Sequence, residues 1–215
     1  GIAFLSTRKS QFAYCWTSPV GILHRMNADG TDQKKISANY LNDFTPYPLD
    51  DGRILYSRWE YVDRPAIPIQ SLWTLNPDGT GLAGYFGNRV LSPATFMEAR
   101  STPGTDRIVC TTTGHNGPTR GAIGVIDRSR GVNAQAAIWN VTPDVPVPRV
   151  DEGSGNFEGA KPYSTPVPLD QHRFLVSARG PVLVRTFDGA CQSLAVAPPD
   201  QGLQWFGAQP LRERV

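Results

Sequence analysis

The sequence predicts an all-β fold, a β-propeller of which about four blades are present, within a larger ring of roughly six to eight blades. Three observations lead to this prediction: one hairpin turn recurs about every 50 residues, a short strand recurs ahead of it, and helical periodicity is nearly absent. The 19 prolines and 21 glycines interrupt almost every window long enough for a helix. A β-sandwich also has many short strands, but it does not require one turn to recur at a fixed phase.

The recurring turn ends a short apolar strand. Leu23–Thr31 matches Leu72–Thr80, and weaker echoes occupy Ile123–Gly131 and Val182–Gly189. The Asp of each Asp-Gly pair can accept hydrogen bonds from its own backbone, and the Gly tolerates positive φ. The Asp residues also suggest calcium loops, but no set of five or more oxygen ligands accompanies them, which favours hairpin turns.

The strand ahead of each turn also repeats. Arg53–Ser57 is echoed by Arg107–Thr111 and Arg173–Ser177, and Gly1–Ser6 looks like the same strand without its lead-in. A unit of this kind has one apolar face and cannot hide it alone. We therefore expect successive sheet units that pack on one another.

The first two units follow in order. The first spans approximately residues 1–42, with strands over Ile2–Thr7 and Gly21–Asn27. The second, approximately 43–91, opens with an Asp-Phe-Thr-Pro strand. A loop over Trp59–Pro68 is expected to project between its strands.

The third unit, approximately 92–162, begins with the apolar run Ala94–Met97 and ends in a long loop over 143–162 that is crowded with Pro, Gly and acidic residues. The fourth occupies 163–215, and its tail Gln204–Leu211 resembles the first strand of yet another blade. Because an open arc exposes strand edges, we expect the flanking blades to lie outside this chain.

Composition excludes several classes of function. A formal net charge of +2 with 19% charged residues gives no electrostatic footprint for nucleic acid. No apolar run is long enough to predict a membrane span. The first residues read as a strand and not as a signal peptide, because they lack a basic leader and an extended apolar region.

The three cysteines form no CxxC or CxxCH motif. Cys110 lies inside a predicted strand, where a small core residue is expected. Cys15 and Cys191 lie near loops, so they could pair with each other or with a thiol outside the chain.

Several blocks resemble known sequences. The tandem Asp-Gly-Thr hairpins and the Asp43–Pro46 opener resemble TolB-type propeller repeats. Over nearly the whole chain, the order of the blocks is similar to the propeller of hydrazine synthase alpha-subunit-like proteins. These blocks are HRMNADGTD, DDGRILYSRWEYVDR, TTTGHNGPTRGAIGVID, VTPDVPVP, YSTPVPLD and QPLRERV.

The resemblance implies a periplasmic or extracellular protein in which a haem c domain with a CxxCH motif follows the propeller. That motif is absent here, so we expect no cofactor in this chain and haem c in the parent protein or a partner. Where the family pattern often has two adjacent histidines, this sequence has His115-Asn116.

The candidate binding residues lie in two segments. One is the most singular stretch of the chain and holds Arg58, Trp59, Glu60, Tyr61, Asp63 and Arg64; the other holds His115. The first segment can be a partner-binding or channel-lining surface. It can equally be a lid that packs over the adjoining blade, with Arg58–Asp63 or Glu60–Arg64 charge pairs at its edge.

His115 reads either as a contact residue near the central channel or as a turn histidine bonded to its own loop. No second ligand lies at metal spacing, so no metal site is predicted. The sequence also lacks a GxSxG motif and a phosphate-binding GK[ST] motif, and no catalytic residues are predicted.

These observations predict a non-catalytic binding or scaffolding module of a larger exported protein, which presents blade loops to a protein partner or a c-type cytochrome domain. The alternative is a portion of a hydrazine-synthase-like c-type haem redox enzyme. In either case we expect no turnover by this chain alone, and the parent protein can be a haem oxidoreductase.

Overall fold

The computed structural model describes residues 1–14, 17–61, 69–115, 118–147, 149–150, 162–198 and 204–211. Within these ranges the chain forms β-strands joined by turns and two short 3-10 helices. The all-β prediction is therefore confirmed.

The strands form successive antiparallel units. The first unit consists of β1 (Ile2–Ser6), β2 (Ile22–Met26) and β3 (Lys34–Lys35). The second consists of β4 (Asp43–Pro48), β5 (Ile54–Trp59), β6 (Gln70–Leu75) and β7 (Ala83–Phe86).

The third unit consists of β8 (Thr95–Ser101), β9 (Arg107–Thr113), β10 (Ala122–Asp127) and β11 (Ile138–Asn140), with the 3-10 helices η1 (Arg128–Arg130) and η2 (Gln135–Ala137) between its last two strands. The fourth consists of β12 (Ser164–Pro168), β13 (Arg173–Ser177), β14 (Pro181–Thr186) and β15 (Cys191–Val196). A single parallel bridge between Gln70 and Thr95 joins the second and third units.

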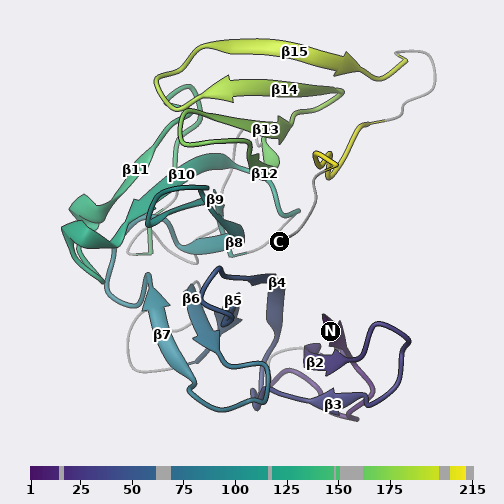
Figure 1. The fold of residues 1–215 in the computed structure, drawn as a ribbon. Coiled ribbons are helices and arrows are strands. Elements are labelled where there is room, and N and C mark those ends of the chain that lie inside the picture. The colour runs from purple at the N-terminus through teal and green to yellow at the C-terminus, as the bar shows by residue number, and fades with distance from the viewer. Residues whose placement is uncertain are drawn as a thin grey trace.

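The units follow one another around a common centre (Figure 1). The first strands β4, β8 and β12 face that centre, and β8 contacts both of the others, while β7, β11 and β15 lie on the outside. Within the described residues, no strand of the fourth unit pairs with a strand of the first, so strand pairing does not join the described units into a closed ring.

The hydrophobic core lies between neighbouring units, because each sheet has apolar side chains to cover on the face toward the next. The cluster between the second and third units is formed chiefly by Leu55, Leu72, Phe86, Phe96 and Ile108. The cluster between the third and fourth is formed chiefly by Val109, Ile123, Val125, Phe174 and Val176.

The Asp-Gly-Thr turns have the expected local chemistry. Asp29 Oδ1 accepts hydrogen bonds from the Thr31 backbone N–H at 3.0 Å and from the Thr31 hydroxyl at 2.7 Å. Gly30, between them, adopts a φ of +84° that glycine tolerates best. Asp78 accepts the same two bonds from Thr80, at 2.9 and 2.7 Å.

A second repeating device was not predicted. The central strands β4, β8 and β12 each contain a bulge with a non-glycine residue at positive φ: Thr45 at +45°, Glu98 at +56° and Thr165 at +51°. The Glu98 N–H donates to Thr45 Oγ1 at 3.0 Å, and the Thr165 N–H donates to Glu98 Oε2 at 2.6 Å. We call this series the bulge relay.

The relay continues into the C-terminal tail, where the Gly207 N–H donates to Thr165 Oγ1 at 3.3 Å. Gly207 also has a positive φ, +65°. The tail 204–211 was predicted to resemble a first strand, yet it forms no strand, because no strand of the described residues pairs with it.

The cysteines differ in exposure. Cys110 is fully buried in β9, as the strand prediction requires, and Cys191 is exposed at the start of β15. Cys191 is free in the described part of the chain. Cys15 itself lies outside the described residues.

Candidate functional site

Two of the predicted loop residues belong to a strand. Arg58 and Trp59 end β5, paired with Ser71 and Gln70 of β6, and both are buried. The predicted loop over Trp59–Pro68 therefore begins later than expected, because the ladder with β6 continues to its last pair. Residues 62–68, including Asp63 and Arg64, lie outside the described residues.

The Arg58 guanidinium faces a mostly enclosed carboxylate. Its Nε lies 2.8 Å from Glu60 Oε1, and its Nη1 donates to the Ala38 carbonyl at 3.1 Å. Its Cζ lies 5.5 Å from the centre of the Trp73 ring. Arg58 thus pairs with Glu60, two residues along the chain. The predicted pairs with Asp63 and Arg64 involve residues outside the described ranges.

Trp59, Tyr61 and His115 come together, and we call them the aromatic cluster. The Trp59 and Tyr61 rings meet edge to face, with centres 5.3 Å apart and an interplanar angle of 81°. The Trp59 and His115 rings lie 5.0 Å apart at 62°. The cluster therefore joins the end of β5 in the second unit to the segment after β9 in the third.

Tyr61 is fixed by a residue that the sequence did not single out. The Tyr40 hydroxyl donates to the Tyr61 carbonyl at 2.6 Å and accepts from the Tyr61 N–H at 2.9 Å. The Tyr40 ring in turn stacks on Tyr14, with centres 5.3 Å apart. The sequence does not predict these two hydrogen bonds, because no local pattern distinguishes Tyr40 from any other tyrosine between strands.

Gln70 was also missed. Its Nε2 lies 3.1 Å from His115 Nδ1. Because an amide nitrogen only donates, Nδ1 accepts, and the neutral imidazole then carries its proton on Nε2. Burial lowers the pKa of His115 below its ordinary value, so the ring is neutral at pH 7.

Two buried polar atoms of the site lack a partner. Trp59 Nε1, a donor, and Gln70 Oε1, an acceptor, form no hydrogen bond with any described residue. The two residues are direct cross-strand neighbours in the β5–β6 ladder. An unsatisfied buried group costs about 1–3 kcal/mol, so each of these two atoms lowers the stability of the folded chain.

A buried network of polar side chains binds the backbone carbonyl of Trp59. Asn39 Nδ2 donates to the Trp59 carbonyl at 3.1 Å and to Asp43 Oδ1 at 3.0 Å. The Ser37 hydroxyl donates to Asp43 Oδ2 at 2.5 Å. Burial raises the pKa of Asp43, while these two donors act in the opposite direction.

In the described part of the chain, no three His, Cys, Asp or Glu side chains gather as a metal site would need. The sequence contains no CxxCH motif, so its own residues do not fit covalent haem c attachment. No helix in the described ranges is long and apolar enough to cross a bilayer.

The comparisons with known proteins concern the fold. No family model and no curated protein matches the sequence. Among solved structures, hydrazine synthase from Kuenenia stuttgartiensis is similar, with 18% identity, a TM-score of 0.62, and coverage of 85% of this chain and 26% of that one. The tricorn protease is similar with 16% identity, a TM-score of 0.51, and coverage of 89% and 17%.

Both solved structures have β-propeller-type folds, so the likeness shows that this chain has a fold related to propellers. At these identities the likeness does not extend to function. The chain spans about a quarter or less of each matched chain.

Proposed function

We propose that this chain is the β-propeller portion of a larger exported protein and acts as a non-catalytic binding module, within a ring of roughly six to eight blades. The observation that carries this proposal is the aromatic cluster, in which Trp59, Tyr61 and the half-buried His115 contact one another at one end of two adjacent units.

The position of the aromatic cluster supports a protein partner. Tyr61 and His115 lie in the connections that follow β5 and β9, at one end of adjacent units. Aromatic side chains that are rigidly held at such an end are typical anchors of interfaces. Our proposed partner is a c-type cytochrome domain of the same protein or of another chain.

The test measures binding of the 215-residue chain to a soluble monohaem c-type cytochrome by isothermal titration calorimetry. We expect saturable binding that His115→Gln weakens about tenfold. The matched control is His172→Gln, because His172 is exposed in the turn before β13, at the opposite end of the units.

Trp59→Phe makes the test sharper. It shrinks the ring that contacts Tyr61 and His115, so it should weaken binding, and the melting temperature of the variant measures the cost of the smaller ring in the core. The proposal fails if the cytochrome does not bind, or if the His115 and His172 variants bind equally.

The second candidate is a portion of a hydrazine-synthase-like haem redox enzyme, favoured by the fold likeness to that enzyme. Since this chain lacks the residues for covalent haem attachment, the haem would be held elsewhere in the parent protein. A Soret band with stoichiometric iron in the purified parent would favour this candidate. A colourless parent that binds the cytochrome would favour the binding module.

A further inference from the structure

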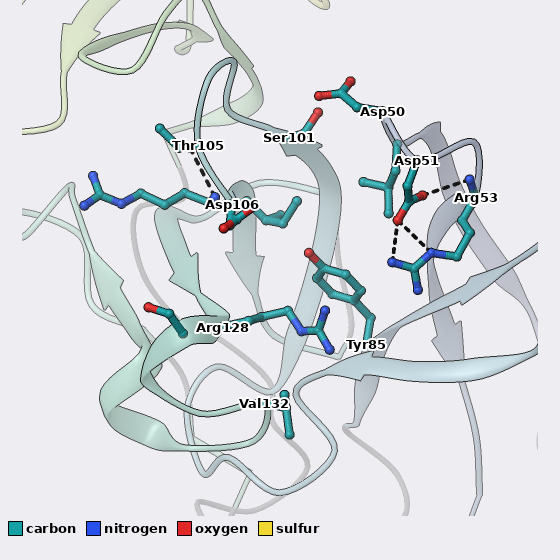
Figure 2. A pocket seen from close by; sticks show the side chains of 13 residues that line it. Asp50, Asp51, Arg53, Tyr85, Ser101, Thr105, Asp106, Arg128 and Val132 are labelled. Atoms are coloured by element: carbon teal, nitrogen blue, oxygen red, sulfur yellow. Dashed lines mark hydrogen bonds and ion pairs between the residues drawn. The ribbon is translucent and has the colours of Figure 1, made fainter.

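A cavity of about 500 Å³ lies between the second and third units (Figure 2). It is at the end opposite the aromatic cluster, because it lies before β5 and β9 and the cluster lies where those strands end. Its walls come from the turns before β5 and β9, from β7 and from η1. Neither the predicted site nor the proposed function uses it.

The repeating turn changes at this cavity. In the other three units, the turn before the last strand contains Asp-Gly, whereas the third unit has Asp127–Gly131 with the sequence DRSRG, folded as η1. Arg128 thus occupies the place held by Ala28, Pro77 and Phe187 in the other turns. The departure from the repeat introduces a positive charge into the cavity wall.

Arg128 is held by an aromatic ring and by no carboxylate. Its guanidinium lies 4.1 Å from the centre of the Tyr85 ring, a close cation–π contact (Figure 2). Among the described residues no acidic side chain forms an ion pair with it, and its buried Nε has no hydrogen-bond partner.

The other two arginines of the cavity each have a carboxylate partner. Asp51 Oδ2 accepts from both Arg53 Nε, at 2.8 Å, and Arg53 Nη2, at 2.6 Å. Arg107 Nε lies 4.0 Å from Asp127 Oδ2. A planar guanidinium that already stacks on a ring retains its edge for a second, coplanar partner, and carboxylates fit that edge.

The remaining walls restrict the charge and size of a ligand. The carboxylates of Asp50 and Asp106 are exposed at the cavity wall and would repel a multiply charged anion. Buried Ile108 and the half-buried Leu49 supply apolar surface, and Ser101 and Thr105 supply hydroxyls. Among the described residues, Arg128 is the one cation of this wall without an ion-pair partner, and beside apolar surface it suits a ligand with one negative charge and an apolar body.

We propose that this cavity binds a small organic monocarboxylate, whose carboxylate pairs with the Arg128 guanidinium while its body lies against the apolar wall. Tyr85 orients the guanidinium from the opposite side. The burial that raises the pKa of Tyr85 also keeps its phenol protonated, so the hydroxyl remains available as a donor.

The test titrates the 215-residue chain with benzoate and with benzamide, its uncharged isostere, and follows ¹H–¹⁵N NMR spectra that include the arginine Nε–H signals. We expect saturable benzoate binding, with benzamide about tenfold weaker. The Arg128 Nε–H signal should move on benzoate addition, and the Arg107 signal should move much less.

Arg128→Gln should weaken benzoate binding about tenfold. Arg107→Gln is the matched control, since it removes an arginine that has a carboxylate partner from the same wall, and it should change affinity by less than about twofold. The wild-type arginine signals decide the question independently if the Arg128 variant does not fold.

Four results would overturn the proposal. They are no saturable benzoate binding, equal binding of benzoate and benzamide, unchanged affinity in a folded Arg128→Gln variant, and tighter binding of inorganic phosphate than of benzoate.

Discussion

The carboxylate of Glu98 accepts the backbone N–H of Thr165 at 2.6 Å, although the two residues are 67 positions apart and belong to different sheet units. The same oxygen accepts the Thr111 hydroxyl at 2.8 Å. Burial raises the pKa of Glu98, and these two donors act in the opposite direction. One oxygen thus ties β8 to β9 and to β12.

Glu98→Ala should destabilise the fold by about 1–3 kcal/mol, because it leaves the buried Thr165 N–H without an acceptor. Glu98→Gln should remain within about 1 kcal/mol of wild type, since its amide oxygen can accept both bonds and no charge is buried. Urea unfolding at pH 7 measures both variants. Equal losses in the two would show that the relay does not depend on this acceptor.

His115 should make stability depend on pH. Its folded pKa lies below the ordinary value of 6.5, so the unfolded chain takes up the proton first. The stabilisation is fully present above about pH 6.5 and is lost as the pH falls through the folded pKa. His115→Gln should flatten this part of the curve in chemical unfolding between pH 4.5 and 7.5.

The Asp-Gly-Thr turns allow a matched comparison of two glycines. Gly30 and Gly79 have φ values of +84° and +91°, so alanine is strained at either. A Cβ at Gly30 meets nothing within 4 Å, but a Cβ at Gly79 would lie 2.8 Å from the Ile36 carbonyl oxygen. Gly30→Ala should cost about 1 kcal/mol and Gly79→Ala clearly more.

Thermal unfolding of the two variants measures the difference. Equal melting temperatures would contradict the contact between the second turn and the first sheet unit.

The cysteines should differ in reactivity. Burial raises the pKa of the Cys110 thiol far above its ordinary value, while Cys191 is exposed. In a Cys15→Ser background, one thiol should react with Ellman's reagent within minutes and the second only in denaturant. Cys191→Ser should abolish the fast phase, and Cys110→Ser should leave it intact.

The sequence predicts those elements whose interactions are local. The turn at Asn76–Thr80 is held by bonds within five residues, and the strand over β5 is identified by its β-forming side chains. The placement of Arg58 and Trp59 in β5 was missed, because their polar and aromatic side chains look like loop residues while the ladder with β6 decides the conformation.

The contacts of the site were beyond sequence reasoning for a different reason. Gln70 and His115 are 45 positions apart and meet only because neighbouring units stack. The positive φ at Thr45 and Thr165 runs against the preference of a β-branched residue, so no local pattern marks it. Tertiary packing imposes both features.

The bulge relay also matters to anyone who would recombine these repeats. Its acceptors are a threonine hydroxyl, a glutamate carboxylate and a second threonine hydroxyl, which differ in reach, and Gly207 offers none. A duplicated or transposed repeat would therefore meet an acceptor of the wrong length at its new junction. Exchanging the order of the repeats in this protein therefore requires a redesigned acceptor side chain at each junction that the bulge relay crosses.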